Sequence, residues 1–398
     1  MSSLLLDSQQ SLLPGTTTQQ RRWNKQLIHI YRTWINYKLG TKIFISTVLL
    51  VVTLITVFIF TSVTGIQLSL PHTYFLSSHS NQPTIYVSIA SYRDPQCHLT
   101  IRDMYEHSEY PERIHVGIYQ QHGEKEDDCL KDLDQYDYVK LQNIKIERVH
   151  FSEGRGPCAA RYHCSKLYGD EDYYLQLDAH TRFIDSWDSI LIDEIHNCTI
   201  QNEMNQRVVL STYPLEYKVE DDSIPKDAAQ VTTKFCTAKF NNEGIVQPYA
   251  GIIRTPDRYY EVPFVAGGFM FGPGSMIHDV PYDPDLPFLF HGEELMYSVR
   301  LYTAGYRMYG PRYSTAFHFY NRPTFAKVWV DAPDYYTISK TSVDKVKRSL
   351  LLFDENHPDR HGPVTTYTVA PEDVEKFYTR WNFNRTSKAE IKFDGCGG

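Results

Sequence analysis

The chain has 398 residues, of which 42% are hydrophobic and 22% are charged, and this composition excludes a protein that is disordered throughout. Its formal net charge of −8 argues against nucleic acid as a partner, because phosphate binding requires a basic surface. Aromatic residues make up 14% of the chain. Their faces suit carbohydrate rings, although packing in a protein core explains them equally well.

The first distinctive segment is Ile43–Val63, which carries no charged residue and is long enough to cross a bilayer core of about 30 Å. A series of Lys and Arg residues ending at Lys42 precedes it, whereas the next Lys or Arg after it is Arg93. This asymmetry predicts a cytosolic N-terminus and a luminal remainder. A cleaved signal peptide is the alternative, but the segment begins far from Met1. We therefore expect an uncleaved type II signal anchor.

All seven cysteines follow this segment, on the side where an oxidising compartment allows disulfides to persist. They are Cys97, Cys129, Cys158, Cys164, Cys198, Cys236 and Cys396. Their spacing matches no zinc module, so we expect up to three disulfides and one free thiol, with the pairing left open. Two N-glycosylation patterns, beginning at Asn197 and Asn384, lie on the same predicted luminal side.

We expect residues 1–42 to form a polar tail and residues 64–83 a short stem, and from Thr84 the pattern alternates between strands and helices. The expected strands are Thr84–Ile89, Ile114–Tyr119, Ile144–Val149 and Tyr173–Leu177, and the expected helices are Cys158–Leu167 and Trp187–His196. This alternation predicts an α/β fold in which helices cover both faces of a parallel sheet. In such sheets, ligands bind beyond the carboxyl ends of the strands.

Asp178 and His180 directly follow the fourth expected strand. In an extended chain, side chains two residues apart point to the same side, and a turn can bring both onto one cation. A carboxylate oxygen, an imidazole nitrogen and oxygens of a bound ligand together suit Mn²⁺. The alternative is that Asp178 caps the following turn and His180 lies at the surface. Their place at the end of a buried strand favours the metal site.

Several stretches of the chain resemble, in their order, the polypeptide and hydroxyproline α-N-acetylglucosaminyltransferases. The stretches are VSIASYRDPQC (Val87–Cys97), HVGIYQQ (His115–Gln121), GPCAAR (Gly156–Arg161), YYLQLDAHTRF (Tyr173–Phe183), STYP (Ser211–Pro214), VAGGFMFG (Val265–Gly272), PYDPDLPFLFHGEE (Pro281–Glu294) and FHFYNR (Phe317–Arg322). Together they cover roughly residues 84–322. The Asp-x-His pair and the Gly-Gly loop are also similar to those of the more distant polypeptide GalNAc-transferases.

The resemblance implies a single nucleotide-diphospho-sugar transferase domain, of the Rossmann-like GT-A class, at residues 84–322 behind the N-terminal transmembrane helix, with residues 323–398 as an extension packed on it. It implies a retaining glycosyltransferase that uses Mn²⁺ or another divalent cation and moves N-acetylglucosamine from UDP-GlcNAc to a Ser, Thr or hydroxyproline hydroxyl of a protein. The anchor then points to the Golgi or ER membrane and to Ser/Thr-rich secretory or mucin-like acceptors. UDP-GalNAc or another hexose donor, and a non-catalytic type II membrane binding module, remain alternatives.

The resemblance also assigns roles to single residues. It implies that His318 is the third metal ligand beside Asp178 and His180, with a buried structural histidine as the alternative. It implies that Arg161 contacts the donor phosphates or sugar, where a guanidinium matches phosphate oxygens well, and a surface salt bridge is the alternative. The residues implied to face the nucleotide belong to the turn after the first strand and are Ser88, Ala90, Arg93 and Asp94.

Two further pairs complete the implied site. Gly267 and Gly268 would let the backbone approach the sugar closely, because only glycine leaves that room. Glu293 and Glu294 are the implied catalytic acids, one of which faces the sugar or the acceptor. Both open a predicted helix, so a favourable interaction with the helix dipole is the alternative.

Overall fold

The computed structural model describes residues 82–218, 222–394 and 396. The expected cytosolic tail and signal anchor lie outside the described residues, as does almost all of the stem. None of the helices within the described ranges is long and apolar enough to cross a membrane. Residues Asn81–Gly398 form one compact unit.

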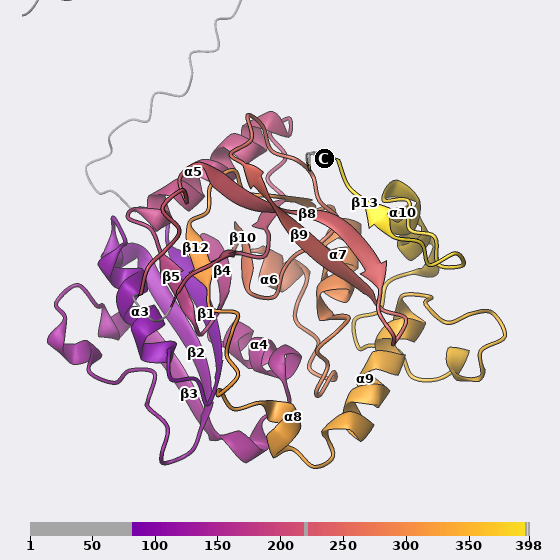
Figure 1. Ribbon diagram of the computed structural model, residues 1–398, viewed down its shortest axis with the longest axis horizontal. Coiled ribbons are helices and arrows are strands. Elements are labelled where there is room, and N and C mark those ends of the chain that lie inside the picture. Colours follow the sequence, from indigo (N-terminus) through magenta and orange to yellow (C-terminus); the bar gives the residue numbers. More distant parts are fainter. Residues whose placement is uncertain (1–81, 219–221, 395, 397–398) are drawn as a thin grey trace, which may run out of the picture. The chain divides into compact units, whose positions relative to one another are not determined.

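A seven-stranded sheet forms the centre of this unit, in the order β11-β6-β10-β4-β1-β2-β3 (Figure 1). Its strands are β1 (Ile85–Tyr92), β2 (Ile114–His122), β3 (Ile144–His150), β4 (Tyr173–Asp178), β6 (Val208–Ser211), β10 (Phe269–Pro273) and β11 (Arg307–Tyr309). The four strands predicted from the sequence are confirmed, and they pair in parallel. The mixed α/β class is therefore confirmed as well.

The prediction of a parallel sheet was wrong for one strand, because β10 runs antiparallel to both β4 and β6. Phe269, the first residue of β10, lies opposite Leu177 near the end of β4. The reversed strand thus begins at the edge where the parallel strands end. It brings the preceding Gly267 and Gly268 to that edge, which is the edge that the ligand rule for open sheets singles out.

Both faces of the central strands β1 and β4 are buried, which explains why these strands are mostly apolar, whereas the edge strand β3 is partly exposed and alternates polar with apolar residues. Side chains of β1 alternate between two hydrophobic clusters: Ile85 and Val87 belong to one, and Tyr86 to the other. The first cluster includes residues of α3 (Cys97–Glu106) and α5 (Trp187–Gln201). The second includes residues of α4 (Pro157–Lys166), α6 (Met276–Asp279), α7 (Glu293–Thr303), α9 (Tyr335–Ser349) and α10 (Pro371–Arg380).

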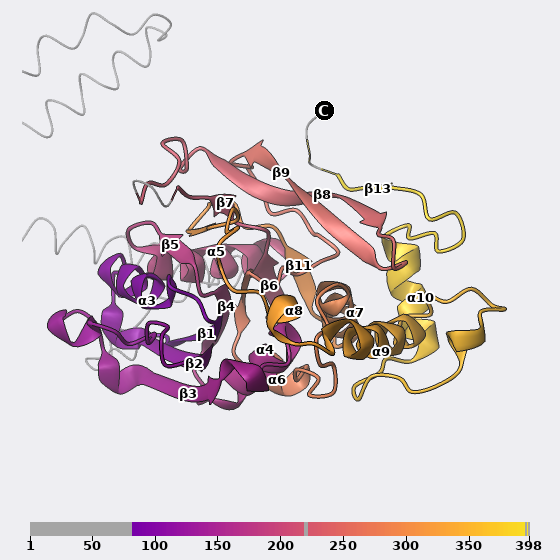
Figure 2. The same cartoon turned by 60° about the horizontal axis from the view of Figure 1, so that its bottom comes forward.

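Two small sheets complete the fold (Figure 2). One joins β5 (Thr181–Phe183), β12 (Ala316–His318) and β7 (Leu215–Glu216), and the other joins β13 (Ile391–Lys392), β8 (Val231–Phe240) and β9 (Val246–Arg254). Short α8 (Val328–Asp331) follows β12. Two disulfides form, Cys97–Cys129 and Cys236–Cys396, and the remaining three cysteines are buried free thiols.

Candidate metal and donor site

A cleft of about 400 Å³ opens where β1 and β4 end. Ten of the residues predicted from the sequence line it: Ala90, Asp94, Arg161, Asp178, His180, Gly267, Gly268, Glu293, Glu294 and His318. Two others, Ser88 and Arg93, do not line it. The structure therefore brings together, from six separate stretches of the chain, most of the side chains that the sequence singled out.

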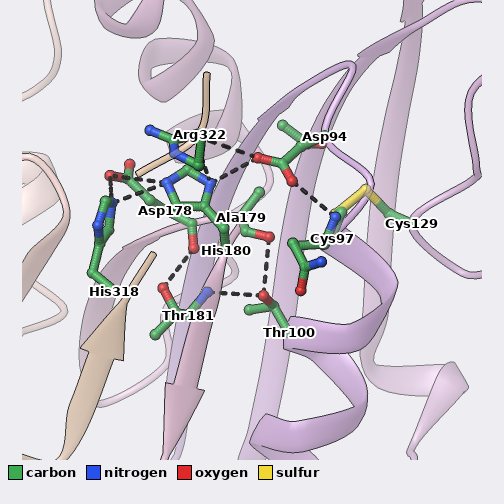
Figure 3. Close-up of polar contacts among 12 residues, drawn as sticks. Asp94, Cys97, Thr100, Cys129, Asp178, Ala179, His180, Thr181, His318 and Arg322 are labelled. Carbon is green, nitrogen blue, oxygen red and sulfur yellow. Dashed lines mark hydrogen bonds and ion pairs between the residues drawn. A yellow bond between two sulfur atoms is a disulfide. The ribbon is translucent and has the colours of Figure 1, made fainter. Parts of the chain in front are cut away.

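The three predicted metal ligands meet at one point of this cleft. Asp178 ends β4, and His318 ends β12, which pairs with β5 so that His318 lies opposite Thr181. His318 Nε2 is 3.0 Å from Asp178 Oδ2 and 2.9 Å from His180 Nε2. One ligand atom of each residue lies within 4.8 Å of the others. Figure 3 shows the three side chains turned toward one another.

The contacts around His180 leave its Nε2 ready to bind a cation. Its Nδ1 lies 2.7 Å from Asp94 Oδ2, and this short contact to a buried carboxylate assigns the proton to Nδ1. Arg322 NH1, which is 3.0 Å from the same nitrogen and 3.8 Å from Asp94 Oδ2, then pairs with the carboxylate rather than with the ring. A carboxylate that orients a histidine in this way is the usual support of a metal-binding imidazole.

The protonation states of the cluster also suit a cation. Burial lowers the pKa of His318 to about 4 against the opposing pull of Asp178, so its imidazole is neutral near pH 7. Burial alone would raise the pKa of Asp178, but contact with His318 and the charge of Arg161 outweigh it and hold that pKa well below its ordinary value. A neutral imidazole at His318 and an ionised carboxylate at Asp178 are the forms in which these side chains bind a metal ion. Such a set fits a divalent cation that accepts mixed nitrogen and oxygen ligands.

Arg161 links the metal cluster to the predicted catalytic acids. It extends from α4, and its guanidinium contacts Glu293 Oε2 at 2.5 Å and Asp178 Oδ1 at 3.2 Å. The side chain is buried between these carboxylates. The alternative of a surface salt bridge is therefore wrong for Arg161.

The two glycines make this close packing possible. A Cβ atom on Gly267 would stand 2.7 Å from Arg161 NH1, and one on Gly268 would stand 2.9 Å from Asp178 Oδ2. Both distances are shorter than van der Waals contact. Close approach of the backbone to a sugar is one reason for glycine at these positions, and the space occupied by Arg161 and Asp178 is a second.

Glu293 and Glu294 begin α7, but both side chains line the cleft. Glu294 Oε1 accepts the Gly267 N–H at 2.8 Å, and its Oε2 accepts the Tyr213 hydroxyl. Burial raises the pKa of Glu294 to about 7, although these hydrogen bonds oppose the shift. A carboxyl group whose pKa lies near neutrality can give or take a proton at physiological pH. Interaction with the helix dipole alone therefore does not describe this pair.

Two of the residues implied to face the nucleotide, Ser88 and Arg93, lie away from the cleft lining. Ser88 lies inside β1, which continues to Tyr92, and its side chain is buried. The guanidinium of Arg93 is held by Glu126 at 2.7 Å and Asp331 at 2.9 Å. The guanidinium of Arg93 is thus engaged by two carboxylates. Its ion pair with Asp331 connects the turn after β1 to α8. Asp94 does face the cleft, where it orients His180.

Other residues of the cleft were missed. Tyr213, Tyr320, Arg322, Lys327 and Trp329 also line it. The first three belong to stretches that carried the family resemblance, so their inclusion there was the available signal. The last two lie beyond the final matching stretch, and nothing in their sequence context marked them.

The chain matches a protein-family model described as "Glycosyltransferase (GlcNAc)" over residues 84–142 and 133–385. Among solved structures, it is similar to GalNAc-T7 with UDP, GalNAc and Mn2+, at 16% identity and a TM-score of 0.46, covering 76% of this chain and 55% of that one. It is also similar to TarS of S. aureus in complex with UDP-GlcNAc, at 12% identity and a TM-score of 0.39, covering 76% of this chain and 74% of that one.

The chain thus spans little more than half the length of the GalNAc-T7 structure. A comparison with curated protein sequences returned no match. The family model, in contrast, extends over most of the chain and over every element that lines the cleft. The chain therefore belongs to the GlcNAc glycosyltransferase family.

Proposed function

We propose that the protein transfers N-acetylglucosamine from UDP-GlcNAc to a Ser, Thr or hydroxyproline hydroxyl of a protein acceptor, with retention of configuration. The observation that carries this proposal is the convergence of Asp178, His180 and His318 beside Arg161, at the carboxyl ends of the central strands. In open α/β sheets this is the edge where nucleotides bind. The membership of the chain in a GlcNAc glycosyltransferase family supports the same donor class.

Different residues of the cleft are proposed to contact different parts of the donor. Asp178, His180 and His318 would hold a divalent cation such as Mn²⁺, which neutralises charge on the diphosphate while the sugar departs. Arg322 and Lys327 line the same cleft and add positive charge near its phosphate end. Arg161, fixed between two carboxylates, is positioned before the substrate arrives, so no free energy is spent on ordering it during the reaction.

The transfer itself is proposed to take place on one face of the sugar. The bond from the anomeric carbon to the diphosphate oxygen breaks, and a bond to the acceptor oxygen forms on the same side. The acceptor proton passes to the departing diphosphate, so no covalent intermediate with the enzyme is needed. Glu294 would hold a sugar or acceptor hydroxyl in place. The configuration of the product, measured by NMR, tests this step, and a β-linked product would contradict it.

We also propose that residues 43–63 anchor the protein as a single-pass type II protein of the Golgi or ER membrane, with the sheet in the lumen. The uncharged segment and the basic residues before it support this topology. The presence of two disulfides also supports it, because disulfides persist in an oxidising compartment such as the lumen. Protease protection in microsomes would test it, and cleavage of the C-terminal part in intact vesicles would contradict it.

The decisive experiment measures UDP release by the full chain from a panel of UDP-sugars with Mn²⁺, in the presence of Ser- and Thr-containing peptides. We expect release with UDP-GlcNAc, abolished by EDTA and by Asp178→Ala. Asp185→Ala, which removes a carboxylate whose side chain is 93% exposed, is the matched control. Preference for UDP-GalNAc would replace the proposed donor. No turnover of any donor would favour a non-catalytic binding module.

A further inference from the structure

Strand β9 ends its sheet and offers an unpaired edge. In the order β13-β8-β9 it pairs with β8 on one side only. Within residues 82–218 and 222–394, no hydrogen bond to the main chain of β9 comes from any element other than β8. Figure 2 shows the β8–β9 hairpin at the top of the view, above the central sheet.

Hydrogen bonds at both ends of the hairpin show which backbone groups face outward. The Asn241 N–H donates to the Ile245 carbonyl at 2.8 Å, and the Thr255 N–H donates to the Gln230 carbonyl at 2.9 Å. Because bonding to the partner alternates along an antiparallel strand, both ends indicate that the odd residues between them bond to β8. The even residues of β9 therefore direct their backbone groups outward: Val246, Pro248, Ala250, Ile252 and Arg254.

Proline supports this assignment independently. Pro248 lies among the outward residues, where its missing N–H removes no bond to β8. Apart from Arg254 at its end, β9 carries no charge, so the charged residues that usually protect a free edge are absent from it. Ile252 is 67% exposed and Tyr249 46% exposed. An apolar edge of this kind is a surface that a further strand can cover.

The position of β9 indicates what covers it. Val246, Gln247 and Pro248, at the start of the strand, line the same cleft as the metal cluster and Glu294. Val246 and Pro248 are buried in the cleft wall, and the accessible part of the outer edge continues from Ala250 to Arg254, away from the proposed reaction centre. A substrate that must place one hydroxyl in the cleft, while its chain continues outside, follows this path. A polypeptide also presents the alternating donors and acceptors that the edge requires, whereas a glycan chain does not.

We propose that β9 binds the acceptor polypeptide as an added strand, so that an extended segment lies along its outer edge and delivers a hydroxyl residue into the cleft. This inference rests on the proposed transfer to a protein. Affinity for the acceptor then comes largely from backbone hydrogen bonds, and binding tolerates many side chains beyond the glycosylated residue.

The first test uses the full chain and a peptide chosen by its turnover with UDP-GlcNAc from a random library around a central Thr or hydroxyproline. Single amides of this peptide are N-methylated in turn. Methylation removes a donor, so we expect KM to rise about three- to tenfold at every second position and to change little at the positions between. A rise that follows no two-residue period would overturn the inference.

The second test changes the strand itself. Ile252→Pro removes an outward N–H and the side chain, whereas Ile252→Ala removes the side chain alone. We expect the proline variant to raise the KM for the peptide about three- to tenfold above that of the alanine variant, with the rate of donor hydrolysis without peptide equal in both. Equal KM values for the two variants would contradict strand addition.

The outcomes separate this inference from the proposed function. If no UDP-sugar is turned over at all, the proposed function fails, and the inference fails with it. If UDP-GlcNAc is hydrolysed but no library peptide is glycosylated, the polypeptide acceptor is overturned while the donor chemistry stands. A dimer that dissociates on Ile252→Pro, measured by analytical ultracentrifugation, would show that a second copy of the chain covers β9 instead.

Discussion

The two ends of the cleft are built in opposite ways. At the metal end, His180 and His318 are each only 6% exposed, and every charged group there has a fixed partner. At the mouth, Phe290 is 52% exposed and Trp329 is 36% exposed, and the two rings contact each other edge to face. If the proposed function holds, the contrast predicts a rigid donor end and an adaptable acceptor end. The following experiments test this contrast.

The largest effect is expected where the rigid end is broken. Arg161→Ala leaves the buried carboxylate of Glu293 and the partly buried carboxylate of Asp178 without the guanidinium that they share, and we expect the free energy of unfolding to fall by about 3–5 kcal/mol. Denaturant titration measures it. Arg148→Ala is the control, because Arg148 makes a comparable but exposed pair with Asp128 that contributes at most about 1 kcal/mol. Equal losses in the two variants would show that the metal end is not specially dependent on its ion pairs.

The pH dependence of stability tests the burial of Glu294. Its pKa is about 7 in the folded chain against an ordinary 4.5, so between these values the folded state keeps a proton that the unfolded state has lost. Stability therefore falls as pH rises through this window. We expect Glu294→Gln to remove roughly 2 kcal/mol of the loss between pH 5 and pH 8. Unfolding in EDTA at both pH values measures it, and parallel curves for the two proteins would contradict it.

Weakening the support of the metal end should have a smaller effect. Asp94→Asn keeps an acceptor for the His180 Nδ1–H but removes its charge, and we expect the Mn²⁺ concentration for half-maximal UDP release to rise about tenfold. Excess Mn²⁺ should restore most of the rate. Asp185→Asn serves as the exposed control. An unchanged Mn²⁺ requirement would mean that Asp94 does not tune the histidine.

The smallest effect is expected at the adaptable end. Trp329→Ala removes an aromatic face from the cleft mouth, and we expect the KM for an acceptor peptide to rise about two- to fivefold, as for loss of one modest aromatic contact. Initial rates at varied peptide and varied UDP-GlcNAc measure both constants. If the KM for UDP-GlcNAc rises instead, Trp329 belongs to the donor end, and the contrast between the two ends must be redrawn.

The sequence predicted best what depends on neighbouring residues. The strands β1, β2 and β4 follow short apolar runs, β3 follows an alternating pattern, and the helix beginning at Glu293 was expected from its own pattern. The reversal of β10 was not predictable, because its direction depends on pairing with β4. The meeting of Asp178 with His318, 140 residues apart, came only from family resemblance. The support of His180 by Asp94 required the fold, because a pattern of residue types does not show which carboxylate a distant ring will reach.

The disulfide Cys236–Cys396 joins Cys396, near the C-terminus, to β8, the strand that pairs with β9. A preparation in which this link alone is left open, as in Cys396→Ser, keeps the disulfide Cys97–Cys129 and the metal cluster, which contains no sulfur. Such a preparation is expected to hydrolyse UDP-GlcNAc and yet modify peptides poorly. An assay of donor hydrolysis alone would therefore not detect a loss of peptide modification. Secretion or periplasmic export, which allows disulfides to form, is the better route to active protein.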